Sequence, residues 1–218
     1  MSTLFSAERK LGLVLVHALA AVCILAANPL HAAENVAIEP PAEGSVSKSE
    51  GLSAWSRIYE VASHPRCANC HVGASGRPMW SGPSFGKERV HGMNIQAGES
   101  RMGLEFVPCS TCHTSKASNN STLHAAPMVA ADWRLAPIEA DWFGKTTEEI
   151  CNQLRDPDRN GGRDWLALAE HLDHDVILHW AWNPGGAREA APYSLQEHVN
   201  DILAWGVAGQ PCPGDEGE

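Results

Sequence analysis

Apolar positions recur every three or four residues in several stretches of the chain, a spacing typical of amphipathic helices. The first stretch precedes residue 67, and its apolar residues are Leu52, Trp55, Ile58, Tyr59 and Ala62. Alternating strand patterns do not occur, and residues 72–103 contain seven Gly and two Pro, which favour irregular loops over strands. The pattern therefore predicts an all-α, loop-rich fold.

The last third of the chain predicts three short helices with recognisable ends. Thr146 and Ser194 are each followed three residues later by Glu, the capping-box spacing that marks a helix start. The first helix ends at Asp156-Pro157, and the second follows a Gly-Gly turn and ends before Asn183-Pro184, because Pro does not continue a helix. The apolar faces of the three helices comprise Ile150 and Leu154, then Trp165, Leu168, Leu172 and Val176, and finally Leu195, Val199, Ile202 and Leu203.

The first 32 residues have the organisation of a secretory leader. Arg9 and Lys10 precede an apolar run, residues 11–27, and a Pro and several small residues up to Ala33 follow. This order predicts a cleaved signal peptide and a periplasmic location, with no stable membrane insertion of the mature chain. The alternative is a retained anchor, since an apolar run of about 17 residues is at the lower limit for a membrane-spanning helix.

Composition and charge narrow the class of protein. With 44% hydrophobic and 19% charged residues, the 218-residue chain is able to pack a core, and wholesale disorder is excluded. Its formal charge of −10 and the absence of any Lys and Arg cluster exclude a nucleic-acid partner. We expect residues 1–32 to form the leader, 33–51 a flexible N-terminal arm, 52–213 one domain and 214–218 a tail.

Four cysteines occur in two copies of one pentapeptide, Cys67-Ala-Asn-Cys70-His71 and Cys109-Ser-Thr-Cys112-His113. Each copy is the C-x-x-C-H signature of covalent haem c attachment. The two thiols reach the two vinyl-derived carbons on one porphyrin edge, and the imidazole that follows ligates the iron. We therefore expect two covalently bound haem c groups, with short helices packed around them and with His71 and His113 as the proximal ligands.

Other uses of the cysteines are less consistent with the pattern. A four-cysteine zinc site usually leaves about 15–20 residues between its two pairs, whereas Cys70 and Cys109 are much further apart. Disulfides within each C-x-x-C are a second alternative, but neither alternative explains the His after each pair. The remaining mature cysteines, Cys151 and Cys212, predict a disulfide that joins a helix to the C-terminal tail, with a free buried pair as the alternative.

The second axial ligands decide whether the irons are closed or open to substrate. His91 lies twenty residues beyond His71, and His124 eleven beyond His113, so both chain segments are long enough to reach the far face of a porphyrin. We expect His91 and His124 to be these ligands, and which iron each serves stays open because crossed ligation is equally feasible. Met79 and Met93 are alternatives near the first motif. Away from the motifs, His171 and His174 predict a solvated helix face and His198 a surface position.

Several segments follow the two pentapeptides in a fixed order. They are Trp133-Arg-Leu-Ala-Pro137, the Cys151 helix closing on Asp156-Pro157, Asn160-Gly-Gly-Arg163, Glu170-His171, Trp180-Ala-Trp182-Asn-Pro-Gly185 and Ala208-Gly-Gln-Pro-Cys-Pro213. Over about residues 64–213 the chain resembles the family of small cytochrome c-like proteins known as isoquinoline 1-oxidoreductase subunits. The resemblance implies a periplasmic haem protein that carries electrons away from a molybdenum hydroxylase of the xanthine-oxidase type, and histidines at positions 91 and 124.

These observations predict a periplasmic dihaem c-type cytochrome that transfers electrons between redox partner proteins. Removal of the leader, whose net charge is +1, leaves a mature chain of −11, which favours a partner with a basic docking patch. The alternative is a small dihaem peroxidase, or another oxidoreductase with one open haem iron. No paired acid and base residues for cleaving an oxygen–oxygen bond stand out beside either motif.

Overall fold

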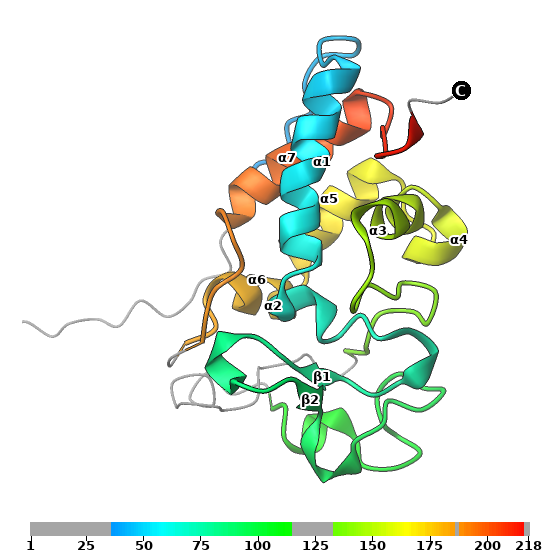
Figure 1. The fold of residues 1–218 in the computed structure, drawn as a ribbon, viewed down its shortest axis with the longest axis vertical. Coiled ribbons are helices and arrows are strands. Elements are labelled where there is room, and N and C mark those ends of the chain that lie inside the picture. The colour runs from blue at the N-terminus through cyan, green and yellow to red at the C-terminus, as the bar shows by residue number, and fades with distance from the viewer. Residues whose placement is uncertain (1–35, 115–132, 186–187, 216–218) are drawn as a thin grey trace, which may run out of the picture. The chain divides into compact units, whose positions relative to one another are not determined.

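Seven α-helices and one two-residue ladder make up the regular structure of residues 36–114, 133–185 and 188–215, which are the residues that the computed structural model describes (Figure 1). The predicted leader and His124 lie outside these residues. Among the described helices, none combines the length and the apolar character needed to cross a bilayer. In chain order the elements are α1 (Lys48–Ala62), α2 (Pro65–Ala68), β1 (Met79–Trp80), β2 (Arg89–Val90), α3 (Thr147–Leu154), α4 (Pro157–Asn160), α5 (Trp165–His174), α6 (Val176–Trp182) and α7 (Leu195–Val207).

Helix α1 begins four residues before the first apolar position predicted for it. Ser47 is its N-cap: the Ser47 hydroxyl accepts the Glu50 N–H at 3.2 Å, and the Glu50 carboxylate accepts the Ser47 N–H at 2.7 Å. This capping box satisfies backbone donors that would otherwise lack partners, so the helix extends to Lys48. Residues 48–51 therefore belong to the helix and not to the arm.

The N-terminal segment that precedes α1 is attached to the helices. The Val36 N–H donates to Asp173 Oδ1 at 3.2 Å, and the Ala37 N–H donates to Gln196 Oε1 at 2.7 Å. Val36 and Ile38 also pack against the main core. In its described part, from Val36 on, the arm expected to be flexible is thus held by side chains of α5 and α7.

The main core lies between α7 and the helices α1 and α5, with α3 against α1. Trp55 of α1 and Trp205 of α7 are fully buried, and their rings contact each other with centroids 5.4 Å apart. Both predicted capping boxes are present, at Thr146 for α3 and at Ser194 for α7. The predicted disulfide is also confirmed: Cys151 on α3 is bonded to Cys212, which follows the end of α7.

One predicted helix is in fact two. The apolar stretch from Trp165 to Val176 indicated a single helix ending before Asn183, but the chain leaves helical geometry at Asp175, whose φ and ψ are −92° and 108°. The Asp175 N–H donates to His171 O at 3.3 Å at the end of α5, and its carboxylate accepts the Ile177 N–H at 3.0 Å at the start of α6. A single Asp therefore ends one helix and caps the next.

The segment predicted to be irregular consists mainly of turns. Residues 72–103 contain three short 3₁₀ turns, and their only ladder among the described residues is the antiparallel pair β1–β2, with Met79 opposite Val90 and Trp80 opposite Arg89. A second, small core of Val72, Ala97 and Leu135 supports these loops. The helix-rich, loop-rich fold class is thus confirmed, and the loops surround the cavity described next.

Candidate haem site

A cavity of about 670 Å³ opens between the second pentapeptide and the β1–β2 loops. Its lining includes Cys109, Cys112 and His113 of the second motif, Cys70 of the first motif, and His91. A volume between about 300 and 1,000 Å³ with a mainly apolar wall is typical of cofactor and ligand sites. The fold therefore brings both predicted attachment motifs to one cavity.

His91 and His113 lie close together in the wall of this cavity. Their ring centroids are 6.3 Å apart, and the rings are tilted by 41°. Two metal–imidazole bonds of about 2.0 Å, with a ring radius of about 1.1 Å on each side, would place the centroids of two axial imidazoles about 6 Å apart. The pair therefore has the separation that a single metal ion between two imidazoles requires.

The backbone orients His91 for such a role. Its N–H donates to Pro78 O at 2.7 Å, and its Nδ1 lies 3.0 Å from Gly92 O. Because a carbonyl oxygen only accepts, Nδ1 carries the proton and the lone pair of Nε2 is left to bind a metal. The main chain thus selects the tautomer that a ligand needs.

The second motif is held by its own turn. Cys109–Thr111 form a 3₁₀ turn, the Cys109 N–H donates to Met102 O at 2.9 Å, and the His113 N–H donates to Cys109 O at 2.9 Å. Cys109 is half-buried, and its pKa is raised by burial, whereas Cys112 is exposed. Both are free thiols, so both are chemically able to form thioether bonds.

The first motif is more enclosed. Cys67 lies on the short helix α2, and burial raises the pKa of Cys67 to about 12 and that of Cys70 to about 11, so both thiols are uncharged. His71 Nδ1 lies 3.2 Å from Ala140 O, and its ring stacks on Trp142 with centroids 3.4 Å apart. Burial lowers the pKa of His71 to about 3, and the neutral ring again leaves Nε2 to bind a metal.

The two alternative uses of the cysteines find no support. All four motif cysteines lie within the described residues and are free thiols, so neither C-x-x-C forms a disulfide. Among the described side chains, no three His, Cys, Asp or Glu converge as metal ligands. Each motif has free thiols for covalent attachment of a haem and a tautomer-fixed imidazole nearby, His71 for the first motif and His91 for the second.

The arrangement of His91 bears on the open question of ligand pairing. It lies opposite His113 of the second motif, which is the crossed pairing, and not opposite His71 of its own loop. Met79 and Met93 also line the cavity, but the Met93 side chain is 76% exposed. The predicted partner His124 falls outside the described residues.

Other histidines differ from the sequence expectation. His198 was expected at the surface, but it is buried beside Trp182, with ring centroids 5.6 Å apart, and burial lowers its pKa to about 3. His171 was expected on a solvated face, but it is half-buried, and burial lowers its pKa. His198 is thus enclosed by its contact with Trp182 of α6.

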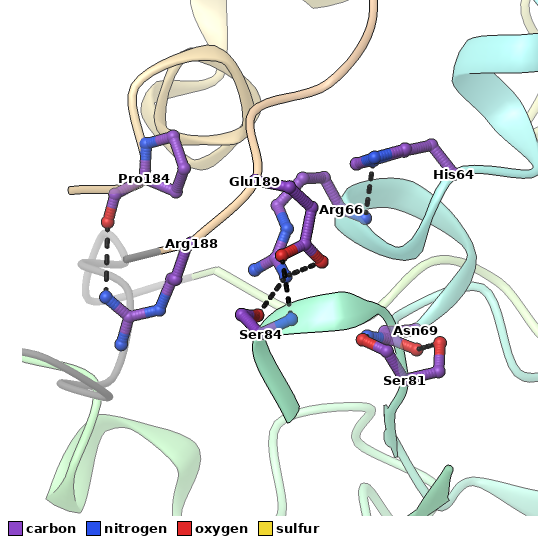
Figure 2. A network of polar contacts seen from close by, with 8 residues as sticks. All are labelled: His64, Arg66, Asn69, Ser81, Ser84, Pro184, Arg188 and Glu189. Carbon is purple, nitrogen blue, oxygen red and sulfur yellow. Dashed lines mark hydrogen bonds and ion pairs between the residues drawn. The ribbon is translucent and has the colours of Figure 1, made fainter. Parts of the chain in front are cut away.

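Sequence reasoning missed a polar network at one side of the cavity. Arg66, directly before Cys67, has a side chain only 3% exposed, and its Nη2 donates to Glu189 Oε1 at 2.9 Å (Figure 2). The Ser84 N–H donates to the other oxygen of Glu189 at 3.1 Å. The position of Arg66 beside an attachment motif was the one signal that could have marked it.

Comparison of the chain with protein-family models, with curated protein sequences and with solved structures gives no match. The function of this chain is therefore inferred from the chemistry of its own residues.

Proposed function

We propose that this chain is a periplasmic dihaem c-type cytochrome that transfers electrons between redox partner proteins. The observation that carries the proposal is the His91–His113 pair, whose centroids are 6.3 Å apart in a cavity lined by Cys109 and Cys112. Two thiols for covalent attachment and two imidazoles for both axial positions are the complete protein contribution to a closed c-type site.

The chain's residues favour electron transfer over catalysis on a substrate. When bound, haem supplies reversible one-electron chemistry at iron. If His91 and His113 both bound the iron, they would leave no ligand position for substrate. The backbone hydrogen bonds to His91 keep its ring in one orientation, which limits reorganisation when the charge at the site changes.

The two attachment sites are adjacent. Cys70 of the first motif and Cys109 of the second line the same cavity, and the charge of Cys109 contributes to raising the pKa of Cys70, after burial. Groups attached at these positions would be close enough for an electron to pass from one to the other within a single chain. One redox partner would then exchange electrons with the first attached group, and the other partner with the second.

The partners follow from charge and from the resemblance. A mature chain of −11 would attract a basic docking patch, and this attraction makes the association rate fall as ionic strength rises. The family resemblance implies that the donor is a molybdenum hydroxylase of the xanthine-oxidase type.

The test uses the full chain expressed with a haem-maturation system. Intact mass spectrometry should give two haem additions. The reduced wild type should not bind carbon monoxide, whereas His91→Ala should bind it at one iron and show a new high-spin signal in EPR. His174→Ala, at an exposed position, is the matched control and should behave as wild type. Rapid carbon monoxide binding by the wild type would instead support the open-iron alternative, and a mass without haem would end the proposal.

A further inference from the structure

The charge of the cavity wall is opposite to that of the chain. Although the formal charge of the chain is −10, the described residues that line the cavity include three Arg and no Asp or Glu. The Arg residues are Arg66, Arg89 and Arg188. Their side chains stay close to aromatic rings of the same wall, Trp80, Phe85 and Trp180. Positive charge concentrated on an otherwise apolar wall suits an anionic ligand with an apolar body.

Arg66 is the most enclosed of the three. Its guanidinium carbon lies 5.7 Å from the Phe85 ring centroid and 5.3 Å from that of Trp180, and its side chain is 3% exposed. Glu189 and Ser84 contact its Nη2, the Ser84 hydroxyl at 3.5 Å. Arg66 Nε is buried and has no hydrogen-bond partner among the described residues. A buried guanidinium with an unused donor has a position for a further acceptor.

A second unused donor lies beside it. The indole N–H of Trp180 is buried and also has no partner among the described residues. The Arg188 guanidinium lies 5.9 Å from the same ring, and it donates to Pro184 O at 3.2 Å (Figure 2). Glu189 pairs with Arg66, and its charge also acts on Arg188. This end of the cavity therefore combines two guanidinium groups with two buried N–H groups, Arg66 Nε and the Trp180 indole, that have no partner among the described residues.

A purely structural role for Arg66 does not account for these features. An ion pair with Glu189 accounts for the position of Arg66 Nη2. It does not account for the unused Nε, nor for the position of the Arg188 guanidinium near that of Arg66. Burial first, and the charge of Arg66 second, lower the pKa of Arg188, whereas the charge of Glu189 raises it. A carboxylate in the cavity would accept the unused N–H groups of Arg66 and Trp180.

We propose that Arg66, Arg188 and the Trp180 indole form a cradle for the propionate carboxylates of the porphyrin attached at Cys109 and Cys112. The inference rests on the proposed function and adds to it a set of residues that would control the reduction potential of this haem. Glu189 is the resident counter-ion of Arg66, and the carboxylate of the cofactor shares the guanidinium with it.

The test compares Arg66→Gln and Glu189→Gln in the holoprotein. Arg57→Gln is the matched control, since Arg57 also pairs with a carboxylate, Asp201, but does not line the cavity. Spectroelectrochemistry should show that Arg66→Gln lowers the potential of one haem by about 59 mV, a tenfold change in the one-electron equilibrium. Glu189→Gln should raise the same potential, and Arg57→Gln should leave both haems unchanged.

Protonation of the carboxylate distinguishes direct binding from a distant charge effect. In the wild type the guanidinium keeps the propionate ionised, so the potential should be constant between about pH 5 and 7. In Arg66→Gln the potential should rise as the pH falls through this range, and an infrared band of a protonated carboxylic acid should appear. Unchanged pH dependence in this variant would overturn the proposal.

Two further measurements separate the remaining outcomes. If Arg66→Gln does not fold, Arg66→Lys replaces it, since Lys keeps the positive charge but lacks Nε. The rise in potential expected for Glu189→Gln then still tests the sign of the charge effect on the haem. Calorimetric titration of the holoprotein with benzoate should give no heat. Heat that disappears in Arg66→Gln would show that the cradle binds a free carboxylate instead. Mass spectrometry counts the haems independently, so a failed cradle and a failed dihaem assignment are distinguishable.

Discussion

The Cys151–Cys212 disulfide gives the prediction whose magnitude follows most directly from the structure. It joins positions 61 residues apart, one on α3 and one after the end of α7, and both residues are fully buried. In the loop-entropy description, opening a loop of this length stabilises the unfolded chain by about 4 kcal/mol. We therefore expect the double variant Cys151→Ala and Cys212→Ala to unfold about 4 kcal/mol more easily, with a melting temperature about 8–16 °C lower.

The assay is urea unfolding at 25 °C followed by far-UV circular dichroism, on samples with equal haem content by mass. Arg155→Gln is the matched control, because it removes the 2.9 Å ion pair with Asp215 in the same tail and leaves the disulfide intact. This half-exposed pair should contribute no more than about 1 kcal/mol. If the double variant and the control unfold at the same urea concentration, the disulfide does not act through the loop it closes.

Two predictions concern α7. Gly206→Ala should destabilise the protein by about 1–3 kcal/mol although Ala favours helices, because a Cβ at this position would overlap the Trp165 ring. Thermal unfolding measures this loss, with Asn200→Ala at an exposed position of α7 as the control. Equal melting temperatures of the two variants would contradict the prediction. His198, whose pKa burial lowers to about 3, resists protonation only in the folded state, so stability should fall as the pH drops from about 6.5 towards 3. His198→Gln should lose about 2 kcal/mol less than wild type between pH 6 and pH 4 in urea titrations, and parallel losses would refute the assignment.

Structural features that depend on a few neighbouring residues in the chain were predictable from the sequence. The capping boxes at Thr146 and Ser194 and the loops between Val72 and Gly103 depend on neighbours in the chain, and the structure confirms them. The break at Asp175 was missed because the apolar periodicity continues across it, while one side chain supplies both helix ends. His198 could have been placed correctly, since it lies three residues after Leu195 on the same face of α7.

Contacts between distant parts of the chain set the limit of sequence reasoning at the site. Arg66 and Glu189 are 123 positions apart, and the arm residue Ala37 binds Gln196 across 159 positions. Chain length alone allowed His91 to lie near either motif, and only the folding of the β1–β2 loops places it beside His113. The pentapeptides marked His71 and His113 as candidate ligands, whereas the nearness of His91 to His113 and the ionic surroundings of the cavity required the fold.

The burial of Cys151 and Cys212 has a consequence for how the protein matures. Thiol–disulfide exchange requires an attacking sulfur to reach the bond, and both of these residues are enclosed in the helical core. The pentapeptide thiols, by contrast, lie at or near the cavity, and Cys112 is exposed. Once α3 has docked, exchange between this disulfide and the four pentapeptide thiols is therefore blocked, because packing separates the buried bridge from the more accessible sulfurs.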